Sequence, residues 1–258
     1  MLKILYFLEL LIWINISAYA ADNSILIQYQ NRPPFFIDNT TTKKLDDGIA
    51  FHLIDKILKR AQINFSYDNQ PLIRTLINIK EDSMPVCFPF AYKSVDREKF
   101  ALFSKAYFKS SKLVIPIKEN DQRFTNIKTL EQLMNNNTLK PILKIGYNHE
   151  EEVARLLEKY KNYSIYKKEN DINQHIVLSS KNQEEMLIQV INNEGDYIIL
   201  TLDEFNYYRE KNPFIKKNTK YVELGDQKNV IRHFMCAKKV GKNVIDKINL
   251  AIDSLNKQ

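Results

Sequence analysis

The sequence contains little glycine, cysteine or tryptophan: its 258 residues include five glycines, two cysteines and one tryptophan. Two cysteines with no histidines at metal-ligand spacing argue against a zinc site. The few glycines form no loop of the kind that cradles phosphate, and no nucleophile stands beside a base in a recognisable motif. We therefore expect no metal and no cofactor, and these absences argue against an enzyme.

A long apolar run occurs only at the N-terminus. Lys3 supplies positive charge, residues 4–16 are mostly apolar, and residues 18–20 (Ala-Tyr-Ala) fit a small-x-small cleavage site. This is the pattern of a secretory signal peptide over residues 1–20, cleaved near Ala20, and it predicts a periplasmic location. Glu9 interrupts the run, and an uncleaved anchor is the alternative, although the run is short for a membrane span.

The excess of positive charge is scattered along the chain. Lysine and arginine number 38 against 31 aspartates and glutamates, a formal net charge of +7, but no basic run carries interleaved aromatic residues. We therefore predict a solubilising surface and no nucleic-acid partner. The fractions of charged residues (27%) and hydrophobic residues (44%) are those of a globular protein, and the length allows one large domain or two lobes.

Stretches with the strand pattern alternate with stretches of helical period. Apolar residues recur at the 3.6-residue period in several segments, while others are β-rich or alternate apolar with polar residues. The expected strands are 24–30, 63–67, 85–90, 112–118, 142–147, 195–200, 221–224 and 231–237, and the clearest helices are 49–61, 150–160, 183–191 and 244–255. This alternation predicts an α/β architecture.

Residues 85–116 carry the most specific signal. After a short apolar strand, Ser94 is suited to cap a helix whose first turn contains Arg97. A cation among the free N–H groups of a helix start is suited to bind an anion. The alternative is a surface arginine paired with Asp96 or Glu98.

Ser-Val-Asp-Arg at 94–97, followed by Phe-Ser-Lys-Ala-Tyr at 103–107, resembles the Thr-x-x-Arg…Phe-Ser-x-Pro-Tyr signature of bacterial extracellular solute-binding proteins of family 3, which bind polar amino acids. The Pro-Phe pair at 34–35 resembles the loop after the family's first strand. The resemblance extends over nearly the whole mature chain and is closer to a divergent branch. It implies a two-lobed periplasmic binding protein-like fold of type II, in which each lobe is a mixed sheet flanked by helices and two strands cross between the lobes.

The resemblance also implies lobe boundaries and a pairing of strands. Residues 21–113 plus 228–258 would form lobe 1 and residues 114–227 lobe 2, with hinges in the crossing segments. The strands that carry Cys87 and Cys236 would then be neighbours, which makes a disulfide geometrically plausible in an oxidising compartment. Two buried free thiols are the alternative.

In the family, an arginine holds the α-carboxylate of the ligand, and this position falls on Arg97. The position of a hydroxyl contact falls on Tyr92, and that of the ammonium-binding aspartate falls on Thr201. The full set of expected ligand-site residues is Tyr29, Arg32, Phe35, Phe90, Tyr92, Arg97, Tyr147, Asn148 and Thr201. A buried ammonium without an anion costs several kcal/mol. Threonine in place of aspartate therefore leaves the ligand open beyond an anionic group stacked on aromatic rings.

The function that the resemblance implies is a monomeric periplasmic solute-binding protein of an ABC-type uptake system. It would bind a small, carboxylate-bearing, amino-acid-like molecule by hinge closure and dock on a membrane permease. One alternative is a ligand-sensing module for a membrane partner, although the chain ends directly after its closing helix. Another is a dehydratase-like periplasmic enzyme, for which Glu204, Glu150 and His149 would supply acid–base groups.

Overall fold

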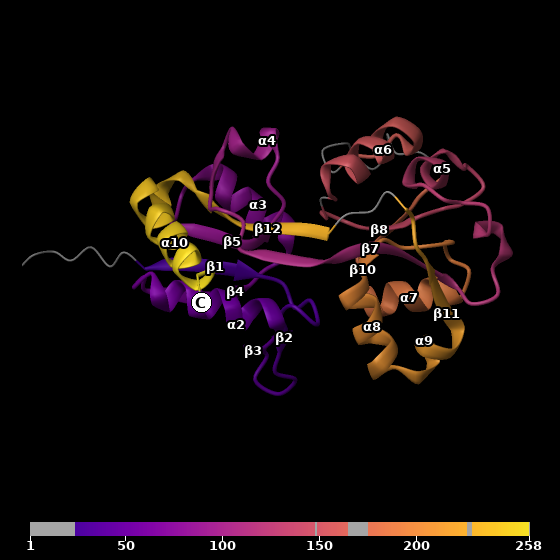
Figure 1. Cartoon of the computed structure of the whole chain (residues 1–258), viewed down its shortest axis with the longest axis horizontal. Coiled ribbons are helices and arrows are strands. Elements are labelled where there is room, and N and C mark those ends of the chain that lie inside the picture. The colour runs from indigo at the N-terminus through magenta and orange to yellow at the C-terminus, as the bar shows by residue number, and fades with distance from the viewer. Residues whose placement is uncertain (1–23, 148, 165–174, 226–228, 258) are drawn as a thin grey trace, which may run out of the picture.

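The computed structural model describes residues 24–147, 149–164, 175–225 and 229–257, so the predicted signal peptide lies outside the described part. Within it, helices and strands form two lobes that lie side by side and are joined by two long strands (Figure 1). Each lobe combines strands with covering helices. The predicted mixed α/β fold with two lobes and two crossover strands is confirmed.

Lobe 1 is built on a sheet in the order β12-β5-β1-β4, in which β1 runs parallel to β4 and β5, while β12 runs antiparallel to β5. Helices α2 and α10 pack against one another beside this sheet, and α3 contacts β5 and β12. The elements of lobe 1 are β1 (Ile25–Tyr29), β2 (Ile37–Asp38), β3 (Leu45–Asp47), α2 (Ile49–Arg60), β4 (Phe65–Asn69), α3 (Leu72–Glu81), β5 (Val86–Ala91), α4 (Val95–Glu98), β6 (Ala101–Phe103), η3 (Lys238–Val240) and α10 (Lys242–Leu255).

The start of helix α2 holds the loop after β1 in place. Gly48 precedes the helix with φ of 131°, and a Cβ there would lie 2.2 Å from the backbone oxygen of Phe35. Only glycine permits this close approach in that backbone conformation. The amides of Ile49 and Ala50 donate to the carbonyls of Pro34 and Phe35. These contacts fix the loop against the start of helix α2. The positions of the loop's side chains therefore depend on this contact.

Lobe 2 arranges short strands and helices around the outer part of β7. Capping boxes begin three of its helices, with Thr129, Asn182 and Thr201 as N-caps. Buried apolar side chains form two clusters, and Val114 and Ile115 of β7 point to different ones. The elements are η1 (Gln122–Phe124), α5 (Leu130–Asn135), β8 (Ile142–Lys144), α6 (Glu151–Lys161), β9 (Val177–Ser179), α7 (Gln183–Ile191), β10 (Leu200–Thr201), α8 (Leu202–Lys211), α9 (Pro213–Asn218) and β11 (Thr219–Val222).

Strands β7 (Phe108–Lys118) and β12 (Asn229–Ala237) pass between the lobes and pair with each other where they cross, with Val230 opposite Ser110. Further along, β12 pairs with β5 and β6 of lobe 1, while β7 pairs with β10 and β11 of lobe 2. The lobe boundaries that we predict remain predictions. One, after residue 113, falls within β7, and the other, after residue 227, lies outside the described residues.

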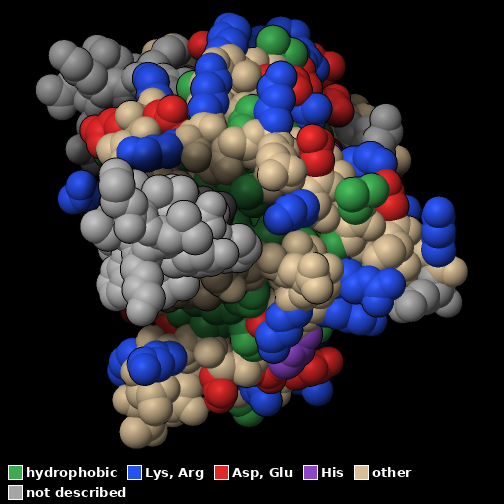
Figure 2. All heavy atoms as spheres, turned by 90° about the vertical axis from the view of Figure 1, so that its left-hand side faces the viewer, with side chains coloured by type: hydrophobic (Ala, Val, Ile, Leu, Met, Phe, Trp, Pro, Cys, Tyr) green, Lys and Arg blue, Asp and Glu red, His purple; other side chains and the backbone are tan. Residues whose placement is uncertain are grey.

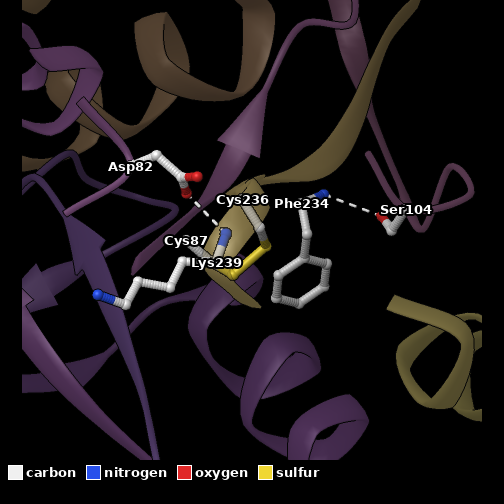
Figure 3. Close-up of a disulfide and its surroundings, with 6 residues drawn as sticks. All are labelled: Asp82, Cys87, Ser104, Phe234, Cys236 and Lys239. Atoms are coloured by element: carbon white, nitrogen blue, oxygen red, sulfur yellow. Dashed lines mark hydrogen bonds between the residues drawn. A yellow bond between two sulfur atoms is a disulfide. The ribbon is translucent and has the colours of Figure 1, made fainter. Parts of the chain in front are cut away.

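A disulfide joins the returning strand β12 to lobe 1. Cys87 of β5 and Cys236 of β12 are register partners, both are fully buried, and their sulfur atoms are bonded (Figure 3). The Ser104 hydroxyl accepts a hydrogen bond from the Phe234 amide nearby, and the Asp82 carboxylate accepts one from the Lys239 amide. The predicted disulfide is confirmed, and the alternative of two free thiols is wrong.

The end of lobe 1 carries charges of both signs. In Figure 2, lysine and arginine side chains lie among aspartates, glutamates and uncharged groups over this face. Among the described residues, no helix combines the length and the apolar character needed to cross a membrane.

We expect removal of the disulfide by Cys87→Ala with Cys236→Ala to lower the free energy of unfolding by about 2–5 kcal/mol, because the bond closes a loop with a sequence separation of 149 residues. Urea unfolding measures the loss. Reductant should destabilise the wild type to the same level and leave the double variant unchanged. Equal stability of oxidised and reduced wild type would contradict this account.

Candidate functional site

An ion pair joins the two lobes. Arg32, in the loop after β1 of lobe 1, reaches Glu204 on α8 of lobe 2. Its Nε donates to Oε1 at 2.7 Å and its Nη2 donates to Oε2 at 3.2 Å. The Glu204 side chain is fully buried, and that of Arg32 is 15% exposed. A two-point contact of this kind fixes the direction of both groups and therefore the approach of the lobes.

Glu204 is held by the cap of its own helix. The amide and the hydroxyl of Thr201 donate to Glu204 Oε2 at 3.1 and 2.8 Å. The Glu204 carboxylate therefore lies against position 201, where the resemblance placed the ammonium-binding aspartate. From the sequence, Glu204 was expected only as an acid–base group of the enzyme alternative and not as part of the ligand site. The capping pattern Thr-x-x-Glu was the signal that would have found it, since it returns the N3 side chain to the N-cap.

Burial by itself would raise the pKa of the Glu204 carboxyl. The charge of Arg32 and the hydrogen bonds from Arg32 and Thr201 outweigh burial and hold this pKa below its ordinary value. The glutamate is accordingly a carboxylate at neutral pH. Burial likewise disfavours the charge on Arg32, but Glu204 raises the pKa of the guanidinium. Each partner keeps the other charged.

Aromatic rings from both lobes, those of Phe35, Phe90 and Tyr147, lie around the guanidinium of Arg32 and are here termed the aromatic bed. The Phe35 and Phe90 ring centroids are 4.7 Å apart, and the Arg32 guanidinium carbon lies 5.8 Å from each. The same carbon lies 5.1 Å from the ring centroid of Tyr147, whose hydroxyl accepts a hydrogen bond from Gln183 of lobe 2. Rings at these distances attract a cation, most strongly where water is excluded.

A second arginine stacks on Phe90 of this aromatic bed and on the neighbouring ring of Tyr92. Arg232 of β12 is 1% exposed, and its guanidinium carbon lies 4.0 Å from the Tyr92 ring centroid and 4.4 Å from that of Phe90. Burial lowers the pKa of this arginine, and the charge of Arg32 lowers it further. The sequence analysis did not assign Arg232 to the site. Its only signal was a charged residue inside an apolar strand.

Arg97 is buried in α4, and its Nη1 donates to the Tyr92 carbonyl at 3.1 Å. Asp96 and Glu98, the carboxylates that the surface alternative assigned to it, pair with Lys99 and Lys93. The alternative of a surface arginine is therefore wrong. Arg97 is not among the residues that line the two cavities described next. Its contact with a ligand remains a prediction.

Two cavities meet at Tyr92 and His149, which line both. The larger, about 560 Å³, lies between α4 of lobe 1 and α6 of lobe 2, which face the same side of the linking strands in Figure 1. The smaller, about 50 Å³, lies at the base and is lined by the Arg32–Glu204 pair, Thr201 and Tyr147. The base of the cleft is therefore almost filled by side chains of the protein.

Of the ligand-site residues expected from the sequence, six lie together at this base: Arg32, Phe35, Phe90, Tyr92, Tyr147 and Thr201. Phe35 is fully buried and also belongs to the apolar core of lobe 1. Tyr29 lies in the core of lobe 1, where its hydroxyl donates to Asp38, and it lines neither cavity. Asn148 lies outside the described residues. All of these ligand contacts remain predictions.

His149 is neutral at physiological pH. Burial, together with the nearby charge of Arg32, lowers the pKa of His149 to about 4, and no described residue bonds to its Nε2. Among the described residues, no group of three His, Cys, Asp or Glu side chains is arranged to hold a metal ion. The arrangement offers charged groups and aromatic faces between two lobes, which are the means to bind a small polar molecule.

We expect Arg32→Met to open the lobes, because a buried carboxylate that loses its partner costs about 3–5 kcal/mol and Glu204 regains water on opening. Small-angle X-ray scattering should show a larger radius of gyration than in the wild type. The matched control is Lys105→Met, which removes an exposed ion pair with Asp253 within lobe 1 and should leave the radius unchanged. An unchanged radius for Arg32→Met would contradict the role of the pair.

We expect His149 to make stability fall with acid. Its pKa is lower in the folded chain than the ordinary 6.5, so its contribution is complete above that value and is lost as pH falls towards about 4. Between pH 7 and pH 4, the free energy of unfolding should therefore fall less in His149→Gln than in the wild type, as measured by urea unfolding. Parallel pH profiles would show that His149 is not buried neutral.

Searches of protein-family models and of curated proteins found no match. Among solved structures, the chain is similar to an ancestral arginine-binding protein bound to arginine, with a TM-score of 0.67, 16% identity, and coverage of 92% of this chain and 93% of that chain. It is similar to the holo arginine-binding protein ArgBP of T. maritima, with a TM-score of 0.66, 16% identity and coverage of 92% of each chain. The arginine-, lysine-, histidine-binding protein ArtJ of Geobacillus stearothermophilus gives a TM-score of 0.67 and 15% identity over 91% of this chain and 89% of that chain. Identities this low establish the fold alone, which is the two-lobed fold of these binding proteins.

Proposed function

We propose that the chain is a periplasmic solute-binding protein that holds a small amino-acid-like ligand between its lobes. The observation that carries the proposal is the Arg32–Glu204 pair, in which a cation of lobe 1 faces an anion of lobe 2 across an aromatic bed. A zwitterion carries the complementary charges. Its carboxylate pairs with Arg32, and its ammonium pairs with Glu204.

Glu204 supplies the acid that position 201 lacks. A buried ammonium needs an anion, and threonine offers none. Hydrogen bonds from the amide and hydroxyl of Thr201 hold the Glu204 carboxylate against that position and keep it charged. The amino-acid class is thereby restored without the aspartate. The ancestral arginine-binding protein, which shares this fold, is known with arginine and with glutamine bound, and this supports an amino-acid ligand.

Binding proceeds by opening and closing of the lobes. The smaller cavity, about 50 Å³, is far below the roughly 300–1,000 Å³ of ligand pockets, so the lobes part before a ligand enters. The ligand then replaces the ion pair, and each lobe exchanges its contact with the other lobe for a contact with the ligand. Closure about β7 and β12 follows, because ligand contacts with both lobes stabilise the closed form. The partner that reads closure is a membrane permease, and the binding protein acts as a monomer.

Binding is better supported than acid–base catalysis. Glu204 is held as a carboxylate by Arg32 and Thr201, and the low pKa of His149 keeps that ring neutral. Neither group is tuned to exchange a proton near neutral pH, which a general acid or base requires. The predicted signal peptide supports the periplasmic location, where such a protein meets its ligand.

The test is a thermal-shift screen of the chain from Ala21 onward with amino acids, their decarboxylated amines and their deaminated hydroxy acids. A true ligand at one hundred times its dissociation constant adds about 2.7 kcal/mol of stability. We expect shifts with intact zwitterions and at least tenfold weaker binding of both analogues.

Glu204→Gln should weaken binding of the zwitterion at least tenfold relative to that of the hydroxy acid, because loss of the Arg32 pair affects both ligands and loss of the ammonium contact affects only the zwitterion. The matched control is Glu210→Gln, an exposed glutamate on the same helix. If no amino acid shifts the melting temperature, or if Glu204→Gln binds as tightly as the wild type, the proposal is wrong.

A further inference from the structure

Arg232 is a buried cation. A ligand with one carboxylate, paired with Arg32, and one ammonium has no anionic group left to pair with it. We propose that Arg232 binds a second anionic group of the ligand, so that the site selects amino-acid-like molecules with a carboxylate side chain. This inference rests on the proposed function and adds the substrate class.

The unoccupied donors of Arg232 form one edge of its guanidinium. Within the described part of the chain, neither its Nε nor its Nη2 has a hydrogen-bond partner, although both are buried. The same two nitrogens of Arg32 grip Glu204 side by side. This edge matches the two oxygens of a carboxylate. The guanidinium carbon lies over the rings of Tyr92 and Phe90, which offer π-electrons and no hydrogen-bond acceptor to these two nitrogens.

A buried cation with a structural role has a different environment in this protein. Lys161 is also fully buried, yet its Nζ donates to the carbonyls of Asn136 and Leu139 and lies 3.5 Å from the Asn137 side-chain oxygen. Its charge is spread over fixed acceptors. Cation–π contacts do not replace such acceptors for Arg232, since they are weaker than the cost of taking an ion out of water. Lobe 1 therefore contains a buried guanidinium, that of Arg232, in which two N–H donors have no acceptor among the described residues.

Arg232 lies directly beside the cleft. It lines neither cavity itself, but it stacks on Tyr92, which lines both, and it shares the Phe90 ring with Arg32, which lines the smaller one. The guanidinium carbons of Arg32 and Arg232 both lie within 5.8 Å of the Phe90 ring centroid. When the lobes part, Glu204 moves away with lobe 2. The ring of Phe90, on which both arginines stack, then faces the open cleft.

The balance of charge points to an anionic ligand. The smaller cavity is lined by Arg32 and Lys144 against Glu150 and Glu204, which cancel. A zwitterion that replaces the Arg32–Glu204 contact leaves this sum unchanged, with Arg232 still unmatched. A ligand with one further carboxylate neutralises it. Charge-assisted hydrogen bonds of about 1.5–3 kcal/mol each then favour this ligand over its amide by at least tenfold.

The experiment measures the affinities of glutamate and aspartate against glutamine and asparagine, which match them in shape and lack the second charge. In the wild type, we expect the better acid to bind at least tenfold more tightly than its amide. Arg232→Met should abolish this preference, because the affinity for the acid should fall at least tenfold more than the affinity for the amide. Arg209→Met is the matched control, since Arg209 also stacks on a ring, but that ring, Phe205, belongs to a core cluster of lobe 2 and lines neither cavity, whereas Tyr92 lines both. It should keep the preference.

The ligand-free melting temperature provides a second reading. Removal of an unmatched charge should leave Arg232→Met as stable as the wild type or more stable, whereas a structural arginine would make the variant less stable. If methionine prevents folding, Arg232→Gln takes its place in the affinity test. Equal wild-type affinity for acids and amides, or a preference that survives loss of Arg232, overturns the inference and leaves the proposed function standing.

Failure of the proposed function has a separate signature, namely that no amino acid binds, acidic or neutral. Succinate and glutarate then test Arg232 alone, because they carry two carboxylates and no ammonium. Binding of either that is lost in Arg232→Met supports an anion site at this arginine. Absence of binding by amino acids and dicarboxylates alike overturns both.

Discussion

The rest of the cleft depends on the buried ion pair between Arg32 and Glu204. Each partner is directed by local chemistry on its own lobe: Gly48 lets the loop that carries Arg32 lie on a helix start, and Thr201 draws in the Glu204 side chain. The desolvation of two ions offsets much of their attraction, so such a pair holds the lobes only marginally better than water or a ligand would. This near balance is what a protein that opens and closes requires.

The fold was predictable because its signals are local. The apolar period of residues 49–61 gave helix α2, which runs from Ile49 to Arg60, and the closing helix was found in the same way. Pairing of Cys87 with Cys236 is not local, since it joins strands far apart in the sequence. That contact came only from resemblance to a topology, and the sequence by itself left the free thiols open.

The sequence predicted the grouping of Arg32 with the aromatic rings and did not predict Glu204 or Arg232 beside them; contact of any of these residues with a ligand remains a prediction. Rings and Arg32 follow strand ends, where loops line clefts, and the structure gathers them. Glu204 was missed because the family's ammonium-binding position was carried over by residue number and fell on Thr201. One helical turn brings the side chain of Glu204 back to Thr201, and a residue count does not show this. Arg232 was missed because its partners belong to another strand, and nothing near it in sequence distinguishes a cation without acceptors from one that carbonyls satisfy.

Strand β12 carries Arg232 and is also one of the two strands that link the lobes. Its first residues pair with β7 up to Arg232, and from His233 onward it pairs with β5 of lobe 1. Arg232 thus stands where the strand passes from one partner to the other, four residues before the disulfide that anchors it at Cys236. The anchored end cannot follow a movement of lobe 2, so bending is confined to the part before it. If the proposed closure and anion site hold, an anion bound at Arg232 would act beside this bend, and the net charge of the ligand would then influence closure.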